Sequence, residues 1–159
     1  MWPFKKSEKP VVKWHVPSGT SDFLVPRQGT QGAMAFDLVC PTEQVVPGTT
    51  AHQVGKGIVN TLVAVTLPPG YAMVLGSRSS LAARYDLTVE AGWIDNDYRG
   101  LIKVVIYNHS SSSYKISAGD RIAQAMIVKV NDVNQEVSYT YPGSKETKRG
   151  TGGFGSTGK

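Results

Sequence analysis

The sequence contains few of the residues that build covalent or metal-based scaffolds. Cys40 is the only cysteine in 159 residues, so the chain can form no internal disulfide and no cysteine-based metal site. The three histidines, His15, His52 and His109, lie near no motif, which argues against a zinc site or a serine–histidine pair. A single thiol suits a reducing compartment, and we expect a cytoplasmic protein.

Long apolar segments are also absent. No run approaches the roughly 18 apolar residues that cross a membrane. The first residues, MWPFKK, lack the apolar stretch of a secretory signal. We therefore expect no membrane partner and no secretion signal.

Basic charge is concentrated at the two ends of the chain. The net charge is +5, and residues 1–13 and 143–159 each carry four basic side chains against one acidic. The part between them is close to neutral. Nucleic-acid-binding proteins more often carry a basic stripe on the folded body, so we expect no nucleic-acid partner. Basic ends can instead attract a small polyanion such as a triphosphate.

Short apolar runs separated by turn residues fill the middle of the sequence. Breaks such as Pro47-Gly48 and Pro68-Pro69-Gly70 recur at short spacing, which is typical of an all-β sandwich or barrel and not of alternating βα units. One helix is expected at 79–85, where Leu-Ala-Ala favours helix and a serine can cap the start. The runs lie at residues 22–25, 35–40, 44–46, 51–54, 57–65, 72–75, 87–89, 101–107, 114–116, 122–130 and 136–139.

Three parts of the chain are expected: a Lys/Pro-rich N-terminal extension at 1–20, a β domain at 21–142, and a glycine-rich C-terminal arm at 143–159. The arm holds six glycines, and glycine loses much backbone entropy on ordering. It also holds Arg149 and Phe154, which can bind anions and stack on bases. Two interpretations remain: a tail without fixed structure, and a flexible arm that becomes ordered over a ligand.

The stretch at 91–100, AGWIDNDYRG, is the centre of the predicted site. It places two carboxylates, a tyrosine and an arginine on a turn between two predicted strands. Asp95 follows the apolar Ile94, so its carboxylate can lie half-sheltered beside a ligand. An ordinary polar turn is the alternative, because Asn and Asp favour turns.

Three further segments carry softer signals. Serines and a guanidinium surround the expected helix start at Arg78, where they can donate to an anion or simply cap the helix. Asp37 lies between apolar residues, where a turn anchor is the alternative. In the turn GDRIAQ at 119–124, we expect Asp120 and Arg121 to pair and Gln124 to offer its amide to a ligand.

Taken together, these segments resemble the five motifs of the trimeric deoxyuridine triphosphatase (dUTPase) family, in order and in spacing. The matching stretches are 34–38, 77–82, 92–100, 119–124 and the arm. The resemblance implies a distorted β jelly roll with one short helix, assembled as a homotrimer whose active sites draw on three copies. Four positions depart from the family pattern: Ala35, Ser77, Trp93 and Leu101.

The resemblance also implies the chemistry. dUTP would be hydrolysed to dUMP and pyrophosphate, which limits uracil incorporation into DNA and supplies dUMP for dTMP synthesis. Asp95 is similar to the catalytic carboxylate, and Asp37 to the residue that holds waters on a Mg²⁺ cofactor. Backbone groups from Val89 to Trp93 would read uracil. The implied substrate-binding residues are Arg78, Ser79, Ser80, Val89, Gly92, Ile94, Tyr98, Gln124, Arg149, Phe154, Gly155, Ser156 and Thr157.

Two other interpretations stay open. The stretch from Arg78 to Arg84 also resembles dCTP deaminase, but that family uses a glutamate on the strand after the hairpin, where this chain has Val105. A non-catalytic β module that senses nucleotides or decorates a capsid is opposed by the joint presence of the acidic, basic and aromatic site residues. A viral or phage source would place the protein in the host cytoplasm.

Overall fold

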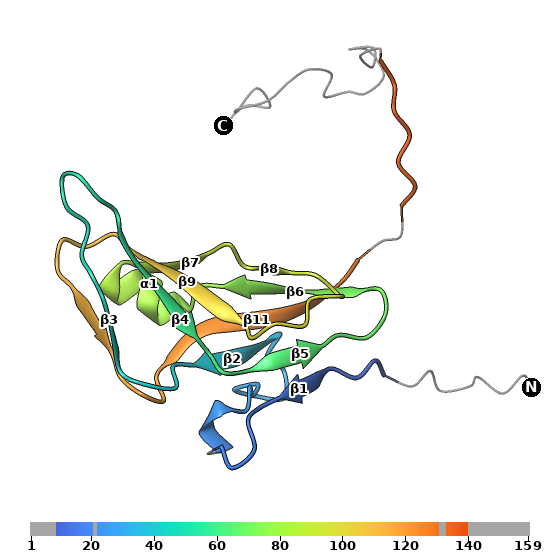
Figure 1. The fold of residues 1–159 in the computed structure, drawn as a ribbon, viewed down its shortest axis with the longest axis horizontal. Helices are drawn as coiled ribbons and strands as arrows, with labels where there is room; N and C mark the ends of the chain where they lie inside the picture. The colour runs from blue at the N-terminus through green and yellow to red at the C-terminus, as the bar shows by residue number, and fades with distance from the viewer. Residues whose placement is uncertain (1–8, 21, 131–132, 140–159) are drawn as a thin grey trace, which may run out of the picture.

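The computed structural model describes residues 9–20, 22–130 and 133–139, and within them the fold is almost entirely β (Figure 1). No helix in this part of the chain is long and apolar enough to cross a membrane. The elements are β1 (Lys13–His15), η1 (Asp22–Leu24), β2 (Ala35–Val39), β3 (Gln44–Val46), β4 (Gly55–Asn60), β5 (Ala64–Thr66), β6 (Tyr71–Gly76), α1 (Ser79–Tyr85), β7 (Leu87–Glu90), β8 (Trp93–Ile94), β9 (Lys103–Asn108), β10 (Tyr114–Ile116) and β11 (Arg121–Lys129).

Two larger antiparallel sheets share one hydrophobic core. The first has the order β2-β11-β6-β8 and the second β4-β9-β7, while β1-β5 and β10-β3 form two-stranded ribbons. Apolar residues alternate along the strands of both sheets and meet in a single cluster. The expected jelly-roll architecture with one short helix is confirmed. The fully buried members of the core include Leu38, Met73, Leu87, Val104 and Ile106.

The outer face of the four-stranded sheet carries two rows of residues that matter for function. One row is polar and aligns Asp37 with Gln124, and Gln124 with Gly76. The next row is apolar and runs across all four strands, in the order Ala35, Met126, Val74 and Trp93. None of these side chains belongs to the buried core. The sheet therefore presents an apolar band to the outside, bordered by a polar corner.

The helix lies where the sequence predicted it, but its start differs. Arg78 is the N-cap, and no side chain caps the helix, so the prediction of a serine cap was wrong. The backbone carbonyl of Arg78 instead accepts from the N–H groups of Leu81 and Ala82, each at 3.0 Å. The hydroxyls of Ser79 and Ser80 are exposed. Neither of these two hydroxyls caps the helix.

Several of the apolar runs do not form one strand each, for local reasons. Residues 22–24 form a 3₁₀ turn, and residues 51–54 form no strand because the Thr50 hydroxyl accepts from the backbone of His52 and Gln53. The run at 57–65 divides into β4 and β5 because Leu62 adopts a left-handed φ of 61°. The Asn60 side chain accepts from the Leu62 N–H at 3.0 Å and fixes that break.

Candidate active site

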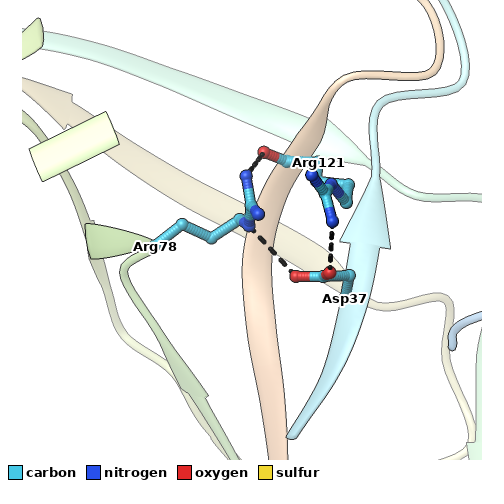
Figure 2. Close-up of polar contacts among 3 residues, drawn as sticks. All are labelled: Asp37, Arg78 and Arg121. Atoms are coloured by element: carbon cyan, nitrogen blue, oxygen red, sulfur yellow. Dashed lines mark hydrogen bonds and ion pairs between the residues drawn. The ribbon is translucent and has the colours of Figure 1, made fainter. Parts of the chain in front are cut away.

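The polar corner is organised around the Asp37 carboxylate (Figure 2). Arg78 Nε donates to one carboxylate oxygen at 3.0 Å, and Arg121 donates to the other at 3.2 Å. A second nitrogen of Arg78 donates to the Arg121 carbonyl at 3.3 Å. The Asp37 and Arg78 side chains are only 16% and 17% exposed, whereas Arg121 is 55% exposed. Two guanidiniums therefore face one carboxylate, which leaves a net positive corner.

The expected pairing of Asp120 with Arg121 was wrong. The Asp120 carboxylate accepts from the Ser117 N–H at 2.8 Å and closes its own turn. Arg121 is thereby left for Asp37 on the neighbouring strand. Sequence reasoning did not predict Arg121 as a site residue, and the only signal available was its place in the turn before Gln124.

Several surface cavities border this corner, and two of them contain Arg78. One, of about 330 Å³, is lined by Asp37, Arg78, Arg121 and Gln124, so it brings together three residues that the sequence singled out. The other, of about 230 Å³, lies between the two arginines and Tyr114. Burial, reinforced by its neighbour Tyr85, raises the pKa of the Tyr114 phenol. That ring stays neutral, and the arginines are the cations of the corner.

A third cavity, of about 170 Å³, lies at the hairpin. Asp95, Tyr98, Trp93 and Lys103 contribute its polar and aromatic lining, and buried Ile94 and Ile102 contribute its floor. Asp95 takes part in none of the ion pairs found among the described residues. Its carboxylate is exposed and available to a ligand or a water molecule.

Asparagine and glycine hold the hairpin in place. The Asn96 amide donates to the carbonyls of Pro68 at 2.8 Å and Tyr71 at 3.0 Å, which fixes the residue next to Asp95. Gly92 approaches β6 so closely that a Cβ there would lie 3.0 Å from the Leu75 side chain. The Leu75 N–H donates to the Gly92 carbonyl at 2.7 Å. These contacts give Asp95 a rigid base.

The Tyr98 ring leans on Gly100. The tyrosine hydroxyl donates to the Leu101 carbonyl at 3.0 Å. A Cβ at Gly100 would lie 2.7 Å from a ring carbon of Tyr98, so only glycine permits this ring position. The ring is therefore held against its own turn with one side facing the cavity.

The backbone groups predicted to read a base are partly engaged by the chain itself. The Val89 N–H donates to the Ser77 hydroxyl at 2.8 Å, and the Gly92 carbonyl accepts from Leu75. Lys103 offers groups that the sequence did not indicate. The Ile102 N–H donates to the Val63 carbonyl, and the Ile102 carbonyl accepts from the Thr61 N–H. Because the backbone groups of successive strand residues point to opposite sides, the N–H and carbonyl of Lys103 point away from Val63 and Thr61.

On that opposite side the strand pairing has already ended. The β7–β9 ladder stops at Glu90 and Val105, two residues short of Lys103. The Lys103 backbone thus faces a gap between two strands, beside the Asp95 cavity. The alternation of strand residues after Gly100 is the sequence signal from which the direction of the Lys103 backbone groups could have been predicted.

The two halves of the site are far apart in one chain. Asp37 lies on β2 and Asp95 follows β8, at opposite edges of the four-stranded sheet. Strand spacing gives about 14 Å across the sheet, and the register adds about 13 Å along it, so the separation is on the order of 20 Å. One copy of the chain cannot bring both carboxylates to the same phosphorus atom.

The described residues offer no cluster of three or more acidic, histidine or cysteine ligands for a metal. Asp37 can nevertheless serve a hydrated cation, because a carboxylate has about four acceptor positions and two are used here. Magnesium dehydrates reluctantly and often binds through its waters and substrate phosphates. Its donor chemistry fits this corner. Arg149, Phe154, Gly155, Ser156 and Thr157 lie outside the described residues.

The fold and the two half-sites define an all-β protein with an anion-binding corner and a separate carboxylate-bearing cavity. Comparison with known proteins agrees with that class. The dUTPase family model matches residues 21–158. The chain belongs to the dUTPase family and is a hydrolase of that class.

Curated relatives named deoxyuridine 5'-triphosphate nucleotidohydrolase match over most of their length. One from Candida albicans is 39% identical and covers 85% of this chain and 81% of the relative. One from Wolinella succinogenes is 39% identical and covers 86% and 87%. Among solved structures, a mutant of the Staphylococcus bacteriophage 80alpha dUTPase with dUpNHpp has a TM-score of 0.78 at 23% identity, over 94% of this chain and 99% of that one.

A second phage structure shares the fold and concerns a metal. The dUTPase of phage phi11 of S. aureus, in a mutant described for its coordination of a structural Mg(II) ion, has a TM-score of 0.69. It is 21% identical and covers 82% of this chain and 98% of that one. At this identity the likeness supports the jelly-roll fold alone.

Proposed function

We propose that the protein hydrolyses dUTP to dUMP and pyrophosphate in a site assembled from three copies of the chain. The observation that carries the proposal is the placement of two complementary half-sites at opposite edges of one sheet. One half offers guanidiniums for phosphates, and the other offers a free carboxylate in a small cavity. A neighbouring copy that packs on the apolar band would bring its hairpin to the polar corner of the first.

The apolar band supports this assembly. Ala35, Met126 and Val74 form a continuous apolar row on the outside of the sheet, and Trp93 lies beyond its end, at the border of the hairpin cavity. Such a row gains stability when a partner covers it. The row lies between the two half-sites, so a homotrimer that buried it would place hairpin and corner of different copies together.

The reaction needs positioning and charge stabilisation more than covalent chemistry. The Asp95 carboxylate takes a proton from water as the water oxygen bonds to the α-phosphorus. The bond between that phosphorus and the bridging oxygen breaks, and pyrophosphate leaves. Arg78, Ser79, Ser80 and Gln124 bind phosphate oxygens. Magnesium, when bound, neutralises triphosphate charge, with Asp37 holding its waters.

The nucleoside end would be selected by the hairpin. The backbone of Val89, Gly92 and Ile94 contacts the base, together with the Lys103 groups that face the strand gap. Tyr98 packs against the deoxyribose and crowds out a 2′-hydroxyl. Equal hydrolysis rates for UTP and dUTP would contradict the Tyr98 role.

The C-terminal arm would complete the site from the third copy. Arg149, Ser156 and Thr157 bind phosphates, the Gly155 backbone approaches the nucleotide, and Phe154 stacks on uracil. Stacking on a base is worth about 1–3 kcal/mol, so F154A should weaken substrate binding about tenfold. Full activity after deletion of residues 149–159 would contradict this part of the proposal.

The deciding experiment measures pyrophosphate release from dUTP with Mg²⁺, using the full-length chain. The expected result is release that depends on both, with UTP and dCTP as poor substrates. Ammonia release from dCTP would support the deaminase alternative. The sequence opposes that alternative, because the chain has Val105 where the deaminase family has its glutamate. Binding of dUTP without pyrophosphate release would indicate a nucleotide-sensing module. The metabolic consequence, less uracil in DNA and more dUMP for dTMP, follows from the reaction.

A further inference from the structure

Trp93 is 79% exposed, which is unusual for a residue that is highly buried on average. Its indole lines the hairpin cavity together with Asp95 and Tyr98. It is therefore not an isolated surface side chain. A large aromatic face borders the cavity in which the chemistry is proposed to occur.

Strand geometry places Trp93 on the same side as Asp95. Ile94, between them, points inward and is 9% exposed, and successive side chains in a strand alternate sides. The indole and the carboxylate thus emerge side by side. A ligand that reaches Asp95 passes the indole.

The backbone beneath Trp93 is held firmly. Trp93 pairs with Val74 and Ile94 with Met73 on β6, and Gly92 makes the close approach to Leu75. The indole itself has no aromatic partner among the described residues, where the ring pairs are Trp14–Phe36 and Tyr85–Tyr114. A fixed backbone with an unpaired ring is well suited to stack on a ligand.

We propose that Trp93 contacts the deoxyuridine part of the bound nucleotide and increases its affinity. This inference rests on the proposed function and deepens it. The indole packs on the nucleoside from the side opposite Tyr98, whose hydroxyl is engaged with Leu101. Trp93 touches no transferred atom, so it sets the KM and leaves the kcat nearly unchanged.

The test follows the intrinsic fluorescence of the full-length protein during titration with dUpNHpp, the imido analogue of dUTP. The protein has three tryptophans. We expect a saturable change in wild type and in the control variant W2F, and its loss in W93F. In steady-state assays, W93V should raise the KM for dUTP about tenfold, with kcat within about twofold and an unchanged sedimentation coefficient.

Three outcomes would overturn the inference: a fluorescence change that persists in W93F, an unchanged KM in W93V, or dissociation of the assembly in W93V. The last would assign Trp93 to packing between copies. Wild-type turnover separates this inference from the proposed function. Hydrolysis without a Trp93-dependent signal overturns only the inference, whereas a Trp93-dependent signal without hydrolysis overturns only the proposed function.

Discussion

Asp37 and Asp95 occupy opposite edges of the same four-stranded sheet, on the order of 20 Å apart by strand spacing and register. A water molecule bound to Asp95 and a hydrated cation beside Asp37 cannot meet at one phosphorus within a single chain. The distance makes cooperation between copies a geometric requirement of the proposed reaction.

Mixing two inactive variants tests that requirement. D95N lacks the hairpin carboxylate and R78M lacks the phosphate-binding guanidinium, so neither should hydrolyse dUTP alone. Co-expressed in equal amounts with different tags, they should form mixed trimers in which one of the three sites is intact. Pyrophosphate release from the doubly purified material measures this. No recovery in verified mixed assemblies would mean that each site lies within one chain.

Asp95 is expected to act in the chemical step and not in binding. Replacement by asparagine keeps the shape but removes the proton acceptor, and a positioned general base contributes about 10²–10⁴-fold. D95N should therefore lose at least about 100-fold in kcat and retain near-normal affinity for dUpNHpp. E90Q, at an exposed acid that ends the preceding strand β7, is the matched control. Turnover of D95N near wild type would refute the assignment.

Arg78 should not tolerate lysine. Its guanidinium donates to Asp37 and to the Arg121 carbonyl at the same time, and still has N–H groups for a phosphate. A single ammonium cannot reproduce this forked geometry. R78K should lower kcat/KM about tenfold or more, while R84K, in the last turn of the helix, serves as control. Near-wild-type kcat/KM in R78K would mean that positive charge alone is sufficient, and equal loss in both variants would mean that the effect is not specific to Arg78.

Asn96 is expected to hold the hairpin in place and thereby to keep its neighbour Asp95 in position. Its amide donates to the Pro68 and Tyr71 carbonyls, and removal leaves those acceptors without this donor. N96A should cost about 1–3 kcal/mol of unfolding free energy and reduce kcat by misplacing Asp95. Chemical denaturation and steady-state kinetics measure the two effects. D97N, on the exposed side of the turn, should change neither appreciably.

Much of the fold was predictable because the turn residues punctuate it. Segments such as 44–46, 79–85 and 114–116 match the observed elements, since apolar alternation and helix propensity agree there with the tertiary structure. The failures lie where local hydrogen bonds override the pattern. Thr50 closes a turn over residues 52–53, and Leu62 in a left-handed conformation divides a run that reads as one strand.

The site was predictable by residue type but not by arrangement. Asp37, Arg78 and Gln124 lie together, and Asp95 lies apart with Tyr98. Arg121 and the Lys103 backbone were missed. Their roles arise from strand register, which pairs Arg121 with Val39 next to Asp37 and ends the β7–β9 ladder before Lys103. Register depends on contacts between distant segments and cannot be read from a short motif.

The hydrogen bond from the Val89 N–H to the Ser77 hydroxyl joins the segment before Arg78 to the strand that leads into the hairpin. In the proposed ring of three copies, those two segments would serve different pockets. Each chain would then act as a mechanical link between adjacent pockets. Occupation of one pocket would have a hydrogen-bonded route to the next through Ser77.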